Sequence, residues 1–119
     1  MRYWVALALV FAIFAAANAG IGPAHSQNLA IAGDYNAQGT YPDKVPYTGT
    51  VTITPTRQGF RFDWLIDGTR YRGTSTAVNG TTITVDWGDD YPAIYVVGQD
   101  GVLRGTWDNG KATEILTRK

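Results

Sequence analysis

The chain of 119 residues has no cysteine and a single histidine. The absence of cysteine excludes disulfide bonds, thiol nucleophiles and thiolate metal sites. Basic and acidic residues are equal in number, ten of each, so the chain lacks the basic excess typical of nucleic-acid-binding proteins. We therefore expect no nucleic-acid partner. A hydrophobic content of 45% with 14 glycines is too apolar for a disordered chain and too rich in glycine for a helical bundle.

Residues suited to catalysis are also scarce. The one histidine, His25, lies near the N-terminus, far along the chain from Ser75, so a serine nucleophile has no evident base. A glycoside hydrolase would need two surface carboxylates beside a sugar cleft, for which a domain of this size has little room. The candidates for such a pair are Asp63, Asp67, Asp86 and Glu114. We expect no catalytic residues and no enzymatic activity.

One acidic cluster, formed by Asp86, Asp89 and Asp90, could offer oxygen ligands to calcium. Its spacing does not match a known calcium-binding loop. We therefore favour a solvated turn in which Asp89 caps backbone amides, and we expect no metal and no cofactor.

The N-terminal segment predicts a secretory signal peptide. Arg2 gives a positive start, and residues 5–17 form an apolar run of thirteen, shorter than the roughly twenty needed to span a bilayer. Ala17-Asn18-Ala19 matches the A-x-A cleavage pattern, so we expect cleavage after Ala19, with cleavage after Ser26 as the alternative. An uncleaved segment would be the only contact with a membrane. The expected location is periplasmic or secreted.

Three parts of the chain follow from this interpretation. Residues 1–19 are the signal peptide, expected to be helical, and residues 20–28 are a flexible lead-in of small and turn-forming residues. Residues 29–119 form a single domain, in which turn signals recur at short intervals. These signals are Pro42-Asp43-Lys44, residues 55–59, Asp67-Gly68, Asn79-Gly80, residues 88–92, Asp100-Gly101 and Asp108-Asn109-Gly110. Seven turns of this kind separate eight segments of strand length.

The segments alternate between apolar and polar residues. Phe60, Phe62, Trp64 and Ile66 share one face, whereas Arg61 and Asp63 lie on the other. This period of two is typical of half-buried antiparallel strands. We predict an all-β domain, either an eight-stranded antiparallel up-and-down barrel or a closely related β-sandwich, and favour the barrel because closure removes exposed edges.

Glycines and arginines recur on these strands. We predict that Gly49, Gly73 and Gly105 make room inside a narrow barrel for the rings of Trp64, Trp87 and Trp107. Arginines lie on the polar faces, and we expect a solvated face, balanced by Asp63 and Asp86, rather than a basic patch. These arginines are Arg61, Arg70, Arg72 and Arg104.

A series of aromatic and glycine motifs runs through residues 29–119. They are Gly33-Asp-Tyr35, Tyr47-x-Gly-x-Val-x-Ile53, Phe60-x-x-x-Trp64-x-Ile66, Tyr71-x-Gly73, Val85-x-Trp-Gly88, Ala93-Ile-Tyr95, Asp100-Gly-x-Leu-x-Gly-x-Trp107 and Glu114-x-Leu116. The series resembles small exported proteins common among alphaproteobacteria, some of which are labelled fibronectin-binding. A looser resemblance is to calycin-type barrels such as lipocalins and avidin-like proteins. The resemblance implies a fold and carries over no catalytic residue.

Aromatic side chains are the best candidates for binding. We expect most of them in the core, with a few gathered at one barrel mouth as a binding platform, and Tyr91 in the turn at residues 88–92 as the most exposed. The candidates are Tyr91, Trp87, Tyr95, Trp107 and Tyr71.

The expected function is that of an exported, non-enzymatic binding protein. It would contact an extracellular or envelope protein through its loops or outer face, as an adhesin or an inhibitor does. The alternative is a carrier of one small apolar ligand inside the barrel. An interior filled by aromatic rings would exclude a carrier, whereas a cavity of about 300 Å³ or more would favour one.

Overall fold

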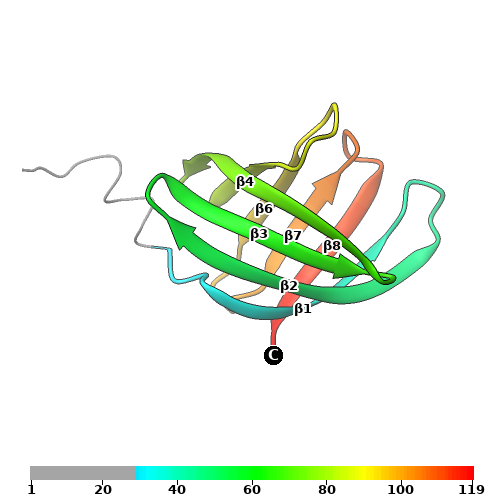
Figure 1. Cartoon of the computed structure of the whole chain (residues 1–119), viewed down its shortest axis with the longest axis horizontal. Helices are drawn as coiled ribbons and strands as arrows, with labels where there is room; N and C mark the ends of the chain where they lie inside the picture. The colour runs from blue at the N-terminus through cyan, green and yellow to red at the C-terminus, as the bar shows by residue number, and fades with distance from the viewer. Residues whose placement is uncertain (1–28) are drawn as a thin grey trace, which may run out of the picture.

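The computed structural model describes residues 29–119, in which eight antiparallel strands surround a single core (Figure 1). The strands are β1 (Gly33–Thr40), β2 (Pro46–Thr56), β3 (Gly59–Ile66), β4 (Thr69–Asn79), β5 (Thr82–Asp86), β6 (Ala93–Val97), β7 (Leu103–Trp107) and β8 (Ala112–Arg118). The predicted signal peptide (residues 1–19) and lead-in (residues 20–28) lie outside the described residues. Residues 29–119 contain no helix long and apolar enough to cross a membrane.

Each strand pairs with the next along the chain, and β1 also pairs with β8, so the sheet closes into a barrel. The closing register joins Tyr35 to Arg118 and Thr40 to Thr113. In a closed barrel each strand pairs with a neighbour on both sides, so no strand edge is exposed. This is the reason why the sequence favours the barrel. The prediction of an eight-stranded antiparallel barrel is confirmed, and the sandwich alternative is not.

The turns lie where the small and polar residues predicted them. All seven connections between strands coincide with the seven turn signals. Asp67 and Gly68 both have positive φ angles, 49° and 78°, which is the combination required by a type I′ hairpin turn.

The strand alternation also follows the sequence. On β3, Phe60, Phe62, Trp64 and Ile66 are buried, whereas Leu65 between them is exposed. Apolar side chains from all eight strands point inward in this way, and they fill the half of the barrel around Phe62.

Residues before β1 cover one end of the barrel, which we call the closed end. The Tyr35 hydroxyl donates to the Ile31 carbonyl at 2.8 Å. The Arg118 guanidinium lies 5.0 Å from the centre of the Tyr35 ring and donates to the carbonyls of Ala30 and Ala32. These contacts hold the entering chain over the core at this end of the barrel.

The prediction for the glycines is wrong at two of three positions. Gly105 lies directly across from Tyr95, and Gly49 directly across from Ile66, so their missing side chains make room for these neighbours. Gly73 alone lies beside the tryptophan that was expected there, Trp87. The physical reason is the strand register, because the side chain directly opposite an inward-facing glycine fills the space that the glycine leaves.

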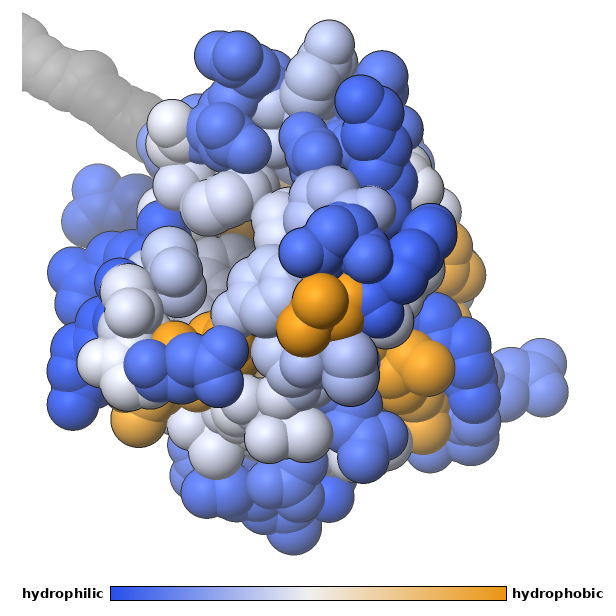
Figure 2. Space-filling view, turned by 90° about the vertical axis from the view of Figure 1, so that its right-hand side faces the viewer, coloured by the Kyte–Doolittle hydropathy of each residue, from blue (hydrophilic) through white to orange (hydrophobic). Residues whose placement is uncertain are grey.

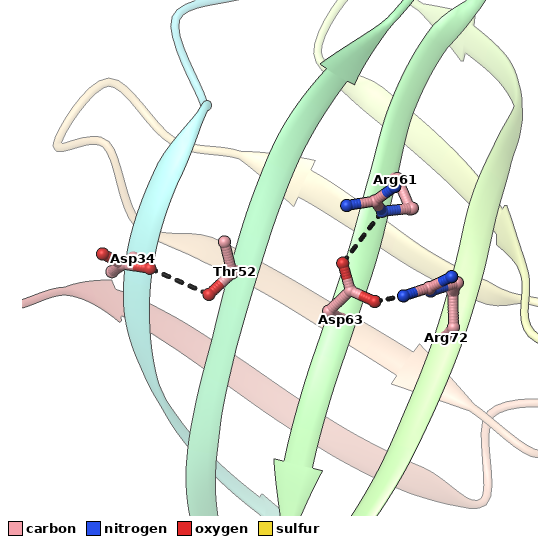
Figure 3. A network of polar contacts seen from close by, with 5 residues as sticks. All are labelled: Asp34, Thr52, Arg61, Asp63 and Arg72. Carbon is pink, nitrogen blue, oxygen red and sulfur yellow. Dashed lines mark hydrogen bonds and ion pairs between the residues drawn. The ribbon is translucent and has the colours of Figure 1, made fainter.

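The outer surface carries ion pairs instead of a basic patch (Figure 3). Asp63 accepts hydrogen bonds from Arg61 at 2.9 Å and Arg72 at 2.7 Å. Burial alone would raise the pKa of Asp63, but the bonds from Arg72 and Arg61 hold that pKa below its usual value. Arg104 pairs with Asp100 at 3.1 Å. The expected balance by Asp63 is confirmed, whereas Asp86 takes part in no ion pair within residues 29–119.

We expect Gly105→Ala to destabilise the barrel. A Cβ atom there would lie 2.5 Å from the Tyr95 ring and 2.7 Å from the Ile94 carbonyl oxygen, so the core would have to move. Overpacking of this kind costs about 1–3 kcal/mol of the free energy of unfolding. Urea denaturation measures this loss, with Thr106→Ala on the exposed face of the same strand as the control. Equal stability of the Gly105→Ala variant and the parent would contradict the close packing described here.

Candidate functional site

A cavity of about 180 Å³ opens at the end of the barrel opposite Ile31, which we call the open end. Its lining residues are Tyr41, Tyr47, Trp64, Ile66, Tyr71, Trp87, Ala93, Tyr95, Trp107 and Glu114. Figure 2 shows the molecule from the side on which the β1–β2 and β3–β4 connections lie in Figure 1. Side chains of intermediate hydropathy occupy the middle of that face beside a few hydrophobic ones, and strongly hydrophilic ones lie above and below them.

Strand polarity explains why these residues meet. In an antiparallel barrel, the ends of β3, β5 and β7 and the starts of β2, β4 and β8 lie at the same end. Ile66 and Trp107 are the last residues of their strands, and Tyr47 is the second residue of β2. Trp64 lies two residues further into its strand and therefore deeper in the barrel.

The floor of the cavity is Glu114, which is 4% exposed and is the one buried charged side chain among residues 29–119. Its Oε1 accepts a hydrogen bond from the Tyr47 hydroxyl at 2.7 Å. Its Oε2 accepts from Trp64 Nε1 at 3.0 Å and from the Tyr95 hydroxyl at 2.5 Å. An ionised carboxylate accepts hydrogen bonds only, and all three contacts bring it a neutral donor.

The hydrogen bonds form a chain with one direction. Trp107 Nε1 donates to the Tyr47 hydroxyl at 3.1 Å, and Tyr47 in turn donates to Glu114. Burial, followed by the negative charge of Glu114, raises the pKa of Tyr95 well above its usual value, and the same causes raise the pKa of Tyr47. Both phenols therefore remain protonated and available as donors.

Aromatic rings form the walls of the cavity, and three neighbouring pairs stand nearly at right angles. Trp87 and Trp107 are 5.8 Å apart at 90°, Tyr71 and Trp87 are 6.1 Å apart at 81°, and Tyr41 and Trp107 are 6.1 Å apart at 84°. Trp87 Nε1 is buried and has no hydrogen-bond partner. In the described part of the chain, every other buried side-chain nitrogen or oxygen has one.

The structure brings together four of the five predicted binding residues. Trp87, Tyr95, Trp107 and Tyr71 all line the cavity. Tyr91 does not line it, although it lies in the β5–β6 connection at the same end and is 45% exposed, as expected for that turn. The cavity thus gathers these residues in one place, and their role in binding stays a prediction.

Sequence reasoning missed Glu114 as a lining residue and considered it only as a surface carboxylate. That interpretation is wrong, because the side chain is buried in the barrel. The sequence did contain a signal, because Glu114 lies on the same face of β8 as the buried residues Ala112 and Leu116. The alternation also predicts an inward direction for Tyr47 and Trp64, but not their shared hydrogen-bond partner.

The acidic cluster near Asp86 is a turn. Within residues 29–119, no group of three or more acidic, histidine or cysteine side chains is placed to hold a metal ion. Asp86, instead of Asp89, makes the turn contact by accepting a hydrogen bond from the Gly88 backbone nitrogen at 2.9 Å.

Comparison with known proteins gives no relative from which a function could be transferred. The sequence matches no protein-family model and is not significantly similar to any curated protein. The function must therefore be inferred from the geometry of the cavity.

We expect the stability of the barrel to fall as the pH rises above about 10. Free tyrosine ionises near that pH, whereas the raised pKa values of Tyr47 and Tyr95 keep both phenols neutral in the folded state. The two phenols stabilise the fold fully below the pKa that tyrosine has in the unfolded chain. This stabilisation is lost as the pH rises toward their pKa in the folded state, because the unfolded state then binds fewer protons than the folded state.

Denaturant titrations at pH 9, 10.5 and 11.5 measure this loss, and tyrosinate absorbance reports ionisation. The Tyr95→Phe variant is the control, since it removes one of the two phenols and should show a shallower dependence on pH. Full ionisation of all tyrosines in the still folded protein at pH 11 would contradict the burial of these hydroxyls.

Proposed function

We propose that the protein binds one small, largely apolar molecule in the cavity at the open end of the barrel. The observation that carries the proposal is a hollow with perpendicular aromatic walls and a hydrogen-bonded polar floor. Ligand sites in proteins have this composition, with apolar and aromatic walls and a few placed polar groups. A core built for stability alone would fill such a space.

The size of the cavity limits the ligand. At about 180 Å³, it is smaller than the 300 Å³ expected of a carrier, yet it is not filled by rings. A buried apolar cavity of about 150 Å³ holds a benzene molecule in an engineered protein. The ligand therefore has roughly the size of one substituted ring. A long acyl chain does not fit, because Phe62, Tyr35 and Ile53 fill the barrel below Glu114.

Simple binding without catalysis is the form of activity that the described residues favour. The hydroxyl of Ser75 accepts a hydrogen bond from the Phe60 backbone nitrogen at 2.9 Å and lies outside the cavity. Among the described residues, 29–119, Glu114 is the only carboxylate that lines the cavity. A pair of carboxylates, as in glycoside hydrolysis, is not gathered there.

A second candidate function is contact with an extracellular or envelope protein through the loops of the open end. The specific observation is that Tyr91 and Val45 are 45% and 50% exposed on two of these loops. Exposed aromatic residues dominate contact energies at interfaces. The resemblance to exported alphaproteobacterial proteins, some labelled fibronectin-binding, supports this candidate and a periplasmic or secreted location.

Titration with phenol, p-cresol and indole tests the first candidate. We expect at least one of these probes to bind with one-to-one stoichiometry by calorimetry and to change tryptophan fluorescence, because Trp87 and Trp107 form the walls. Trp107→Leu removes one wall and should weaken binding at least tenfold. Tyr91→Ala is the matched control, because Tyr91 lies at the same end but does not line the cavity.

The same two variants separate the candidates. Weaker binding of the small probes by Trp107→Leu, with the Tyr91→Ala variant like the parent, supports the small-ligand function. Capture of a protein partner that is lost in Tyr91→Ala, with no probe bound by the parent, would replace it by the second candidate.

A further inference from the structure

We propose that the ligand of the open-end cavity is a small organic ammonium ion. This inference rests on the proposed function, because it names the chemical class of the molecule bound in the same cavity. Two independent features of the cavity support it: a buried carboxylate without a positively charged partner and an arrangement of ring faces.

Within residues 29–119, the carboxylate of Glu114 has no positively charged partner. The ion pairs of this part of the chain join Arg61 and Arg72 to Asp63 and Arg104 to Asp100, all on the outer surface. None of the described lysines and arginines lines the cavity. Buried charges in proteins are usually paired, since an isolated charge loses the solvation of water. A cation in the cavity would supply the missing opposite charge above Glu114.

Glu114 also has room for one more hydrogen bond. A carboxylate offers about four lone-pair positions. Oε2 uses two of them, for Trp64 and Tyr95, whereas Oε1 accepts only from Tyr47. The remaining position on Oε1 is left to face the positively charged group of a ligand. An anion would instead meet the negative charge of the floor, which excludes acidic ligands.

The aromatic walls suit a cation as well. The face of an aromatic ring carries partial negative charge, and a cation within about 6 Å of a ring centre is attracted to it. Trp87 and Trp107 stand at 90° to each other, with Tyr71 nearly perpendicular to Trp87 and Tyr41 nearly perpendicular to Trp107. Rings arranged in this way enclose a space on several sides. Substituted ammonium groups are recognised by such aromatic cages.

The charge of Glu114 also distinguishes a cation from a neutral ligand. A purely apolar ligand would leave the buried carboxylate without an opposite charge, so a cation of the same size is favoured over it.

Choline and 3,3-dimethylbutan-1-ol form a matched pair of probes. They have the same shape and the same hydroxyl group, but the alcohol has a neutral carbon in place of the charged nitrogen. Calorimetry with the purified protein should show choline binding at least tenfold more tightly than the alcohol. Raising the salt concentration from 50 to 500 mM should weaken choline binding only slightly, because the carboxylate is buried.

Glu114→Gln keeps the shape of the floor and removes its charge. We expect this variant to bind choline at least tenfold more weakly and the alcohol about as well as the parent does. Tyr91→Ala, outside the cavity, is the control for both probes. Circular dichroism verifies that each variant is folded. Where Glu114→Gln does not fold, Trp107→Leu takes its place, and it should weaken the binding of choline more than that of the alcohol, because it removes a ring face that attracts the cation.

The outcomes distinguish this inference from the proposed function. Equal binding of the two probes by the parent overturns the ammonium proposal and leaves a small-molecule site intact. Unchanged choline binding by folded Glu114→Gln also overturns it. Binding of neither probe overturns it as well, and the titration with phenol, p-cresol and indole then decides whether the cavity binds small molecules at all.

Discussion

The arrangement of the barrel interior depends on one buried carboxylate and its three donors. Glu114 on β8 accepts hydrogen bonds from Tyr47 on β2, Trp64 on β3 and Tyr95 on β6. These bonds connect strands on different sides of the barrel across its interior. Removing any one donor would leave a buried negative charge with fewer partners, which is costlier than the loss of an ordinary hydrogen bond.

The same bonds explain why the open end stays hollow. Tyr47 and Trp64 are held by Glu114, and Trp107 is held through Tyr47, so the polar tips of these rings have fixed positions. An unrestrained ring would turn into the empty space and gain contacts there. Below Glu114, Phe62 stacks on the Tyr95 ring at 5.4 Å, and apolar side chains fill the interior. The carboxylate therefore divides the barrel into a packed half and an open half.

The sequence predicted the architecture because local signals determine it. Alternation on β3 and turn pairs such as Asp67-Gly68 each act over a few residues, and eight such segments leave few folds open. The site was predicted only in part. The aromatic residues were found by their type, but the hydrogen bonds of Glu114 join it to residues 19, 50 and 67 positions away, and such pairings depend on register around the whole barrel. The error at Gly105, which lies opposite Tyr95, has the same origin.

The buried carboxylate conflicts with stability alone. A leucine in place of Glu114 would bury no charge. Local rules of protein packing are most often broken where a protein acts on something else. Here the exception lies at the floor of a cavity with aromatic walls, and one oxygen of the carboxylate accepts a single hydrogen bond. A positively charged ligand would supply the missing partner of Glu114, which is why its position in the cavity is better explained by recognition than by folding.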